Sequence, residues 1–114
     1  MQVLFFVLDN PELLTPVLRT FYECGIKGAT VLNSTGMGRV LALETSIFAN
    51  LRSLFQGERH YNYTIYTLIE VDFNVDKLKE ELENVVGNLD EDGTGMLFIL
   101  PVIKAYGFGK LKQS

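Results

Sequence analysis

The hydrophobic positions of the chain follow two patterns, short apolar runs of strand length and stripes of apolar residues at helical spacing. Helical spacing indicates two helices, over about 11–24 and 74–87, which end at Gly25 and Gly87, with Asn74 as the cap of the second. Apolar or β-branched runs predict four strands, at residues 2–8, 28–35, 61–72 and 96–102. The predicted order is β-α-β-β-α-β, in a single domain that spans residues 1–114.

This order predicts an α+β fold, the ferredoxin-like βαββαβ sandwich, in which both helices cover one face of the sheet. The first and the last of these runs, VLFFVL and MLFILPV, do not alternate between apolar and polar residues and are apolar on both sides. A sheet with helices on one face needs only one apolar face, so the other would expose Leu, Phe and Ile to water. We therefore expect self-association about a symmetry axis. The alternative is a monomer whose central strands keep a partly apolar outer face.

A long excursion separates the second and third predicted strands, over about 36–60. Connections of this length usually carry a function. Apolar residues at helical spacing within 45–57 predict a short amphipathic helix, which Thr45 or Ser46 would cap and Gly57 would end. This helix would either cover the core or a neighbouring subunit, or present an apolar face to a partner protein.

Charge and cysteine content narrow the classes of protein. The net charge of −4 argues against nonspecific binding of nucleic acid, which needs a basic face. The one cysteine, Cys24, cannot form a disulfide within the chain, which indicates a reducing, cytoplasmic setting. The N-terminal residues lack the features of a signal peptide and read as a strand. No apolar run approaches the ~20 residues that a membrane span needs.

Candidate catalytic and metal-binding patterns are weak. The single histidine, His60, is distant from Cys24, so one chain offers no metal-ligand spacing, although ligands from several subunits stay open. The acidic turn 90–92 lacks the remaining ligands of a calcium loop. No serine has a histidine–acid partner nearby in the sequence. We therefore expect a protein that is not an enzyme, and we assign neither a catalytic residue nor a metal site.

Three segments in this order, ECGIKGATV, TGMGR and GTGMLFILPV, resemble the PII nitrogen-regulatory signal-transduction proteins. The resemblance covers most of the chain, with a gap at the long excursion. It implies a homotrimer of ferredoxin-like subunits that binds a small effector, with an adenine nucleotide as a candidate, in clefts between subunits. It also implies that the excursion at 36–60 protrudes and contacts a target protein.

The resemblance also assigns nucleotide-binding residues in three places. Thr30 would lie near the adenine, and two glycine-containing loops would face the phosphates. Backbone N–H groups in glycine turns can cradle an anion, and an arginine adds charge-assisted hydrogen bonds. The first of these loops contributes Gly36, Gly38 and Arg39, and the second contributes Gly93, Thr94 and Gly95.

The chain departs from the family pattern at several of these positions. Val40 stands where the family has a glutamine that helps to hold a magnesium–oxoglutarate complex, and Met96 stands where it has a lysine. Two tail arginines of the family fall near Gly107 and Gly109. We therefore expect no oxoglutarate sensing, and a less charged nucleotide than ATP, or none, in the cleft. The alternatives are an assembly trimer without a small ligand and a metal-responsive trimer like the divalent-ion tolerance family.

Overall fold

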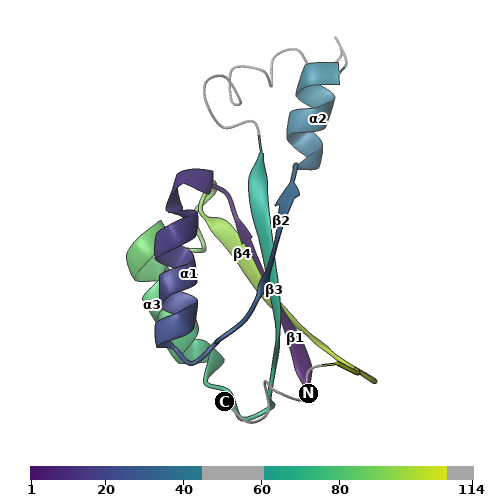
Figure 1. The fold of residues 1–114 in the computed structure, drawn as a ribbon. Helices are drawn as coiled ribbons and strands as arrows, with labels where there is room; N and C mark the ends of the chain where they lie inside the picture. The colour runs from purple at the N-terminus through teal and green to yellow at the C-terminus, as the bar shows by residue number, and fades with distance from the viewer. Residues whose placement is uncertain (45–60, 108–114) are drawn as a thin grey trace.

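The computed structural model describes residues 1–44 and 61–107 of the chain (Figure 1). The expected order of four strands and two helices is confirmed, and a further helix, α2, follows the second strand. The elements are β1 (Gln2–Leu8), the 3₁₀ helix η1 (Pro11–Leu13), α1 (Leu14–Glu23), β2 (Thr30–Ser34), α2 (Met37–Glu44), β3 (Asn62–Ile69), α3 (Val75–Val86) and β4 (Gly95–Pro101).

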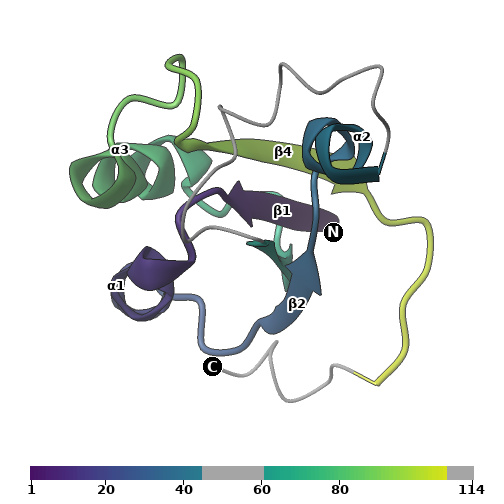
Figure 2. The same ribbon diagram turned by 90° about the horizontal axis from the view of Figure 1, so that it is seen from above.

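The four strands form one antiparallel sheet in the order β2-β3-β1-β4. Helices α1 and α3 cover one face of this sheet, and the other face is open (Figures 1 and 2). The α+β arrangement is compatible with the ferredoxin-like fold. Strands β1 and β2 run in one direction, and β3 and β4 run in the other. We call the end where β2 passes into α2 the upper end of the sheet, and the opposite end, where β1 and β2 begin, the lower end.

The core lies between the sheet and the two covering helices. Alternate residues of β1, namely Leu4, Phe6 and Leu8, are fully buried. The rings of Phe6 and Phe21 meet with their centroids 6.4 Å apart. The other core side chains come from α1, α3, β3 and the loop before β2, and they include Val17, Ile26, Ile65, Ile69, Leu78 and Leu82. This layer is what places the ends of the strands relative to one another.

The helix ends follow the expected capping chemistry. The side-chain oxygen of Asn74 accepts a hydrogen bond from Lys77 N (3.0 Å), and Gly87 ends α3 with a positive φ of 97°. The first predicted helix, 11–24, is instead divided into η1 and α1. Pro16 has no N–H to donate to residue 12, so a continuous α-helix from Pro11 would lack a backbone hydrogen bond at that point.

The segment after β2 differs from the prediction. TGMGR was expected to be a loop that leaves the sheet, but Met37 begins α2 and Val40 N donates to Gly36 O at 3.2 Å. The helix-forming residues that surround Gly38 outweigh its helix-breaking tendency. The amphipathic helix that we expected within 45–57 lies outside the described residues. In the described ranges, no helix is both long enough and apolar enough to cross a membrane.

Candidate functional site

The first group of candidate residues lies at the start of α2, at the upper end of β2. Gly36 precedes the helix, and Gly38 and the half-buried Arg39 belong to its first turn. A helix leaves its first N–H groups without partners inside the helix and carries partial positive charge at this end. The local arrangement therefore combines backbone donors with an arginine, which is chemistry that suits an anionic ligand.

The second group, Gly93–Gly95, lies where the connection after α3 passes into β4, at the same upper end. Gly93 has a positive φ of 81°. A side chain at Gly95 would place its Cβ 2.6 Å from Val7 O, so the backbone of β4 approaches β1 more closely there than any other residue type allows. Thr94 O accepts a hydrogen bond from Asp9 N at 3.5 Å. These residues are therefore held against the end of β1.

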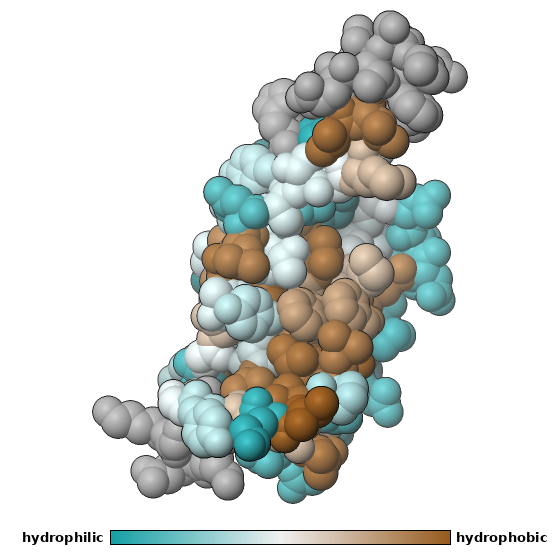
Figure 3. All heavy atoms as spheres, turned by 90° about the vertical axis from the view of Figure 1, so that its right-hand side faces the viewer, coloured by the Kyte–Doolittle hydropathy of each residue, from teal (hydrophilic) through white to brown (hydrophobic). Residues whose placement is uncertain are grey.

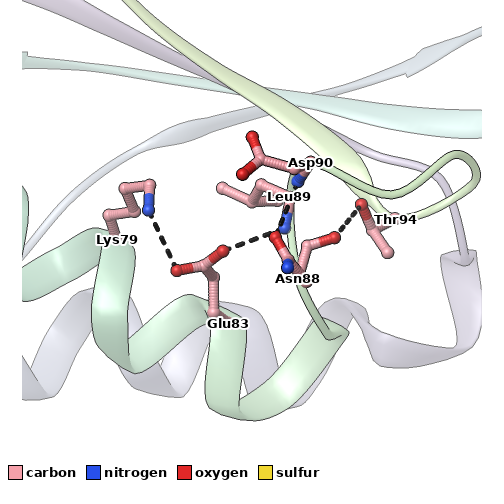
Figure 4. Close-up of polar contacts among 6 residues, drawn as sticks. All are labelled: Lys79, Glu83, Asn88, Leu89, Asp90 and Thr94. Carbon is pink, nitrogen blue, oxygen red and sulfur yellow. Dashed lines mark hydrogen bonds and ion pairs between the residues drawn. The ribbon is translucent and has the colours of Figure 1, made fainter.

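Hydrogen bonds from α3 fix the loop that carries the second group (Figure 4). The Glu83 carboxylate accepts from Leu89 N (2.9 Å) and from Lys79 Nζ (3.0 Å). The bond from the Leu89 backbone, followed by the bond from Lys79, lowers the pKa of Glu83 from its ordinary value of 4.5. The hydroxyl of Thr94 lies within hydrogen-bonding distance of the carbonyl oxygens of Asn88 (3.0 Å) and Glu91 (2.9 Å).

The structure does not bring all the candidate residues together within one protomer. The two groups share the upper end, but β2 and β4 are opposite edges of the described sheet, and three strand spacings amount to about 14 Å. Thr30 begins β2 at the lower end, roughly 20 Å of extended chain from Gly36. A small ligand that contacts all three places would need residues from more than one copy of the chain.

The charges near the two groups differ in sign. Arg39 belongs to the first group, whereas the turn before the second group carries the exposed carboxylates of Asp90, Glu91 and Asp92. The position of a Cβ at Gly93 would lie 3.8 Å from the side-chain oxygen Oδ2 of Asp9, which adds a fourth acid to this corner. A triphosphate beside the second group would be repelled by these negative charges.

The open face of the sheet is apolar, as the doubly apolar strands predicted (Figure 3). The Phe5 ring stacks on Phe98 with centroids 5.1 Å apart, and it contacts Tyr66 at 5.8 Å. We call this surface the open face. Its exposed apolar side chains are Leu32 (47% exposed), Tyr66 (36%), Met96 (55%), Phe98 (38%) and Leu100 (47%).

A polar cluster beside the open face was missed by sequence reasoning. Ser34 Oγ donates to the side-chain oxygen of Asn62, and it lies 2.8 Å from Thr64 Oγ1. Ser34 and Asn62 are paired across β2 and β3. The only sequence signal was the polar character of both strand ends, which does not reveal their register. The cluster borders the first candidate group, because Ser34 is the last residue of β2.

Cys24 lies on the side of the sheet that the helices cover, opposite the open face. Cys24 is half-buried at the end of α1, and burial, with a smaller effect of the Glu81 charge, raises the pKa of its thiol. A thiol with a raised pKa has less of the nucleophilic thiolate form at neutral pH. Among residues 1–44 and 61–107, no three His, Cys, Asp or Glu side chains are grouped so that they could hold a metal ion. His60 lies outside the described residues.

No protein-family model matches the chain, and no curated protein matches it significantly.

Proposed function

We propose that the chain is a PII-like regulatory protein that forms a homotrimer, binds a small effector between subunits and acts on a partner protein. It is not an enzyme in this proposal. The observation that carries it is the position of the two candidate groups at one end of the sheet, on opposite edge strands, next to an apolar open face. A ring of copies would set the β2 edge of one protomer beside the β4 edge of the next.

The open face supports the assembly part of the proposal. A fully exposed side chain of this size presents on the order of 200 Å², so the five exposed residues of the open face present on the order of 450 Å² of apolar surface. A patch of about this size is as large as the largest apolar patch of a typical monomer, and such patches often serve as interaction surfaces. Packing of the open faces around a shared axis removes this surface from water. Each Å² of apolar surface buried in this way lowers the free energy of the assembly by about 25 cal/mol.

The charges support a small effector with few negative groups. In the ring, Arg39 and the start of α2 from one protomer face the second group of its neighbour, with the acidic turn 90–92 behind it. One cation and two sets of backbone donors suit a monophosphate or a cyclic nucleotide better than a triphosphate. An adenine nucleotide of this kind is the effector that we propose.

Helix α2 supports the link to a partner protein. It continues from β2 and projects beyond the upper end of the sheet (Figure 1). An effector held at Gly36–Arg39 would contact the first turn of this helix, so its binding would bias the position of α2. The excursion at 36–60 is the segment that we propose for contact with the target protein.

A second candidate is an assembly trimer without a small ligand. It is favoured by one observation, because the close approach of Gly95 to Val7 O and the positive φ of Gly93 explain both glycines of the second group by the fold alone. In that case the open face would be the functional surface, and the upper end would hold no effector.

Thermal unfolding with nucleotides separates these two candidates. The wild-type protein is measured with AMP, cyclic AMP, ADP and ATP, and its oligomeric state is measured by light scattering. The first proposal predicts a trimer with a midpoint raised by several degrees for AMP or cyclic AMP, since saturation at 100 times Kd adds about 2.7 kcal/mol.

The matched variants are Arg39→Gln and Arg19→Gln, the second being an exposed arginine of α1. For each variant, the unfolding midpoint with nucleotide is compared with the midpoint of the same variant without nucleotide. Arg39→Gln should lose most of the shift, and Arg19→Gln should keep it. A trimer with no shift for any of the four nucleotides would reject the effector part and favour the assembly trimer.

A further inference from the structure

The chain after β4 carries apolar side chains that its own fold leaves uncovered. We call residues 102–107 the arm. A hydrogen bond from Val102 N to Met1 O (3.2 Å) ties the start of the arm to the lower end of the sheet. Beyond it, Ile103 is 99% exposed and Tyr106 is 85% exposed. Figure 2 shows the arm, drawn in yellow after β4, on the side of the sheet away from α1 and α3.

An apolar groove of ≈ 270 Å³ lies between α1 and the start of β2. Its apolar lining comes from α1, from the loop that follows it and from β2. Lys27 is the charged residue among the lining positions, and its Nζ lies 4.1 Å from the centroid of the Tyr22 ring. A hydrogen bond from Thr67 Oγ1 to Gly28 O (2.7 Å) holds the loop in place. The apolar side chains that line the groove are Leu18, Phe21, Tyr22, Ile26, Ala29 and Val31.

Sheet topology relates the arm to the groove. The arm follows β4 and the groove flanks β2, and these are the two edge strands of the described sheet. Both features lie at the lower end, because β2 begins there and β4 ends there. In a ring that sets the β4 edge of one protomer beside the β2 edge of the next, the arm and the neighbour's groove are therefore at the same level.

We propose that the arm of each protomer lies in the groove of the next protomer and adds a strand along the outer edge of β2. This inference rests on the proposed assembly and names the contact that closes the ring. Addition of an extended segment to a sheet edge supplies main-chain hydrogen bonds, and pockets for alternate side chains supply specificity. A contact of this head-to-tail kind forms a closed ring when the rotation between copies closes.

The side-chain pattern of the arm fits this groove. Successive residues of an extended segment point to opposite sides, so Ile103 and Ala105 enter the apolar groove together. Lys104 then points to solvent and away from Lys27, which avoids a pair of like charges in a dry site.

The exposed apolar area of the arm and of the open face supports a second copy of the chain as the partner in this contact. Ile103 adds on the order of 200 Å² of exposed side chain to the roughly 450 Å² of the open face. The total, about 650 Å², is most of the ~800 Å² that one partner contributes to an interface of standard size.

Disulfide trapping between different chains tests the contact directly. Cys24 is the single cysteine, so Cys24→Ser gives a background without thiols. One chain then carries Ala29→Cys and a second, differently tagged chain carries Ile103→Cys. The two are mixed and oxidised gently. We expect a covalent pair that contains both tags, whereas Glu12→Cys, an exposed position on η1, should replace Ala29→Cys with at least about tenfold less product.

The possible results are distinct. A trimer by light scattering without the mixed pair overturns the arm contact and leaves the proposed function standing. A monomer overturns both. A single chain with Ala29→Cys and Ile103→Cys that closes its own disulfide also overturns the inference, since the arm would then occupy its own groove.

A second measurement does not depend on cysteine chemistry. Ile103→Ser should raise the protein concentration at which the trimer dissociates by about tenfold or more, and Lys104→Ser should change it by less than about twofold. Equal effects of the two substitutions would contradict burial of Ile103 between protomers.

Discussion

Gly36 and Gly95 belong to the two candidate loops, but at the scale of single residues their surroundings differ. A Cβ at Gly95 would lie 2.6 Å from Val7 O and 3.3 Å from the Phe6 ring. A Cβ at Gly36 would meet no atom within 4 Å, and the φ of Gly36 is not positive. The fold thus explains the glycine at 95, whereas at 36 it leaves space for a ligand or a neighbouring protomer.

The substitutions Gly95→Ala and Gly36→Ala should therefore have different effects on stability. Gly95→Ala forces β1 and β4 apart beside a fully buried phenylalanine, and we expect a loss of about 2 kcal/mol or more in the free energy of unfolding. Gly36→Ala changes only the residue that precedes α2, and we expect a change within about 1 kcal/mol.

Urea unfolding of both variants measures this difference, provided that protein concentration is kept the same for each. The two substitutions remove a glycine and add one methyl group, so each is the control of the other. Similar losses for both would show that the close approach of β4 to β1 at Gly95 does not determine the choice of glycine there.

At the scale of elements, the carboxylate of Glu83 connects α3 to the loop that carries the second candidate group. It accepts from Leu89 N beyond the end of the helix and from Lys79 one turn earlier in the helix. Both bonds favour the ionised carboxylate and lower its pKa below 4.5 in the folded state. The unfolded chain therefore binds more protons at Glu83 than the folded chain at mildly acidic pH.

This difference gives the contribution of Glu83 a defined pH dependence. The contribution is fully present above the ordinary pKa of 4.5, and it is lost as the pH falls through the lower folded value. The stability difference between the wild type and Glu83→Gln should therefore shrink when unfolding is measured from about pH 7 to about pH 3. Glu80→Gln, an exposed position of α3, is the control and should show a smaller trend. A difference that stays constant with pH would contradict the role of the carboxylate.

Local signals predicted most of the elements correctly. Asn74 and Gly87 mark the ends of α3, and the apolar runs locate the four strands to within a few residues. Helix α2 was missed because Gly36, Gly38 and Arg39 were interpreted as a loop, although the residues around Gly38 favour a helix. The residues of a glycine motif do not by themselves distinguish a turn from the start of a helix.

The candidate site was less predictable than the fold. The apolar open face followed from strands without alternation, which is a property of single runs of sequence. The distribution of Arg39 and Gly95 over opposite edges depends on strand order, which no local pattern contains. The same holds for the contact of Ser34 with Asn62, since cross-strand pairing is set by the register of distant segments.

At the scale of the whole molecule, each end of the described sheet has one candidate contact region on each of the two edge strands. The upper end has one candidate group on each edge, and the lower end has the groove on one edge and the arm on the other. The open face lies between these ends (Figure 3). A cyclic assembly would use all three regions together, so its stability should depend on the centre of the open face as well as on the arm.

Phe98→Glu tests this dependence, because Phe98 is 38% exposed on the open face and stacks on Phe5. In the proposed trimer, burial of a glutamate against two other copies of itself would cost several kcal/mol, so we expect the variant to sediment as a folded monomer and the wild type as a trimer at the same concentration. Val71→Glu places the same charge on a residue that is 71% exposed in the loop before α3, and it should leave the trimer intact. Circular dichroism of both variants establishes that the fold is retained. A Phe98→Glu protein that stays trimeric would show that the copies do not meet through the open face.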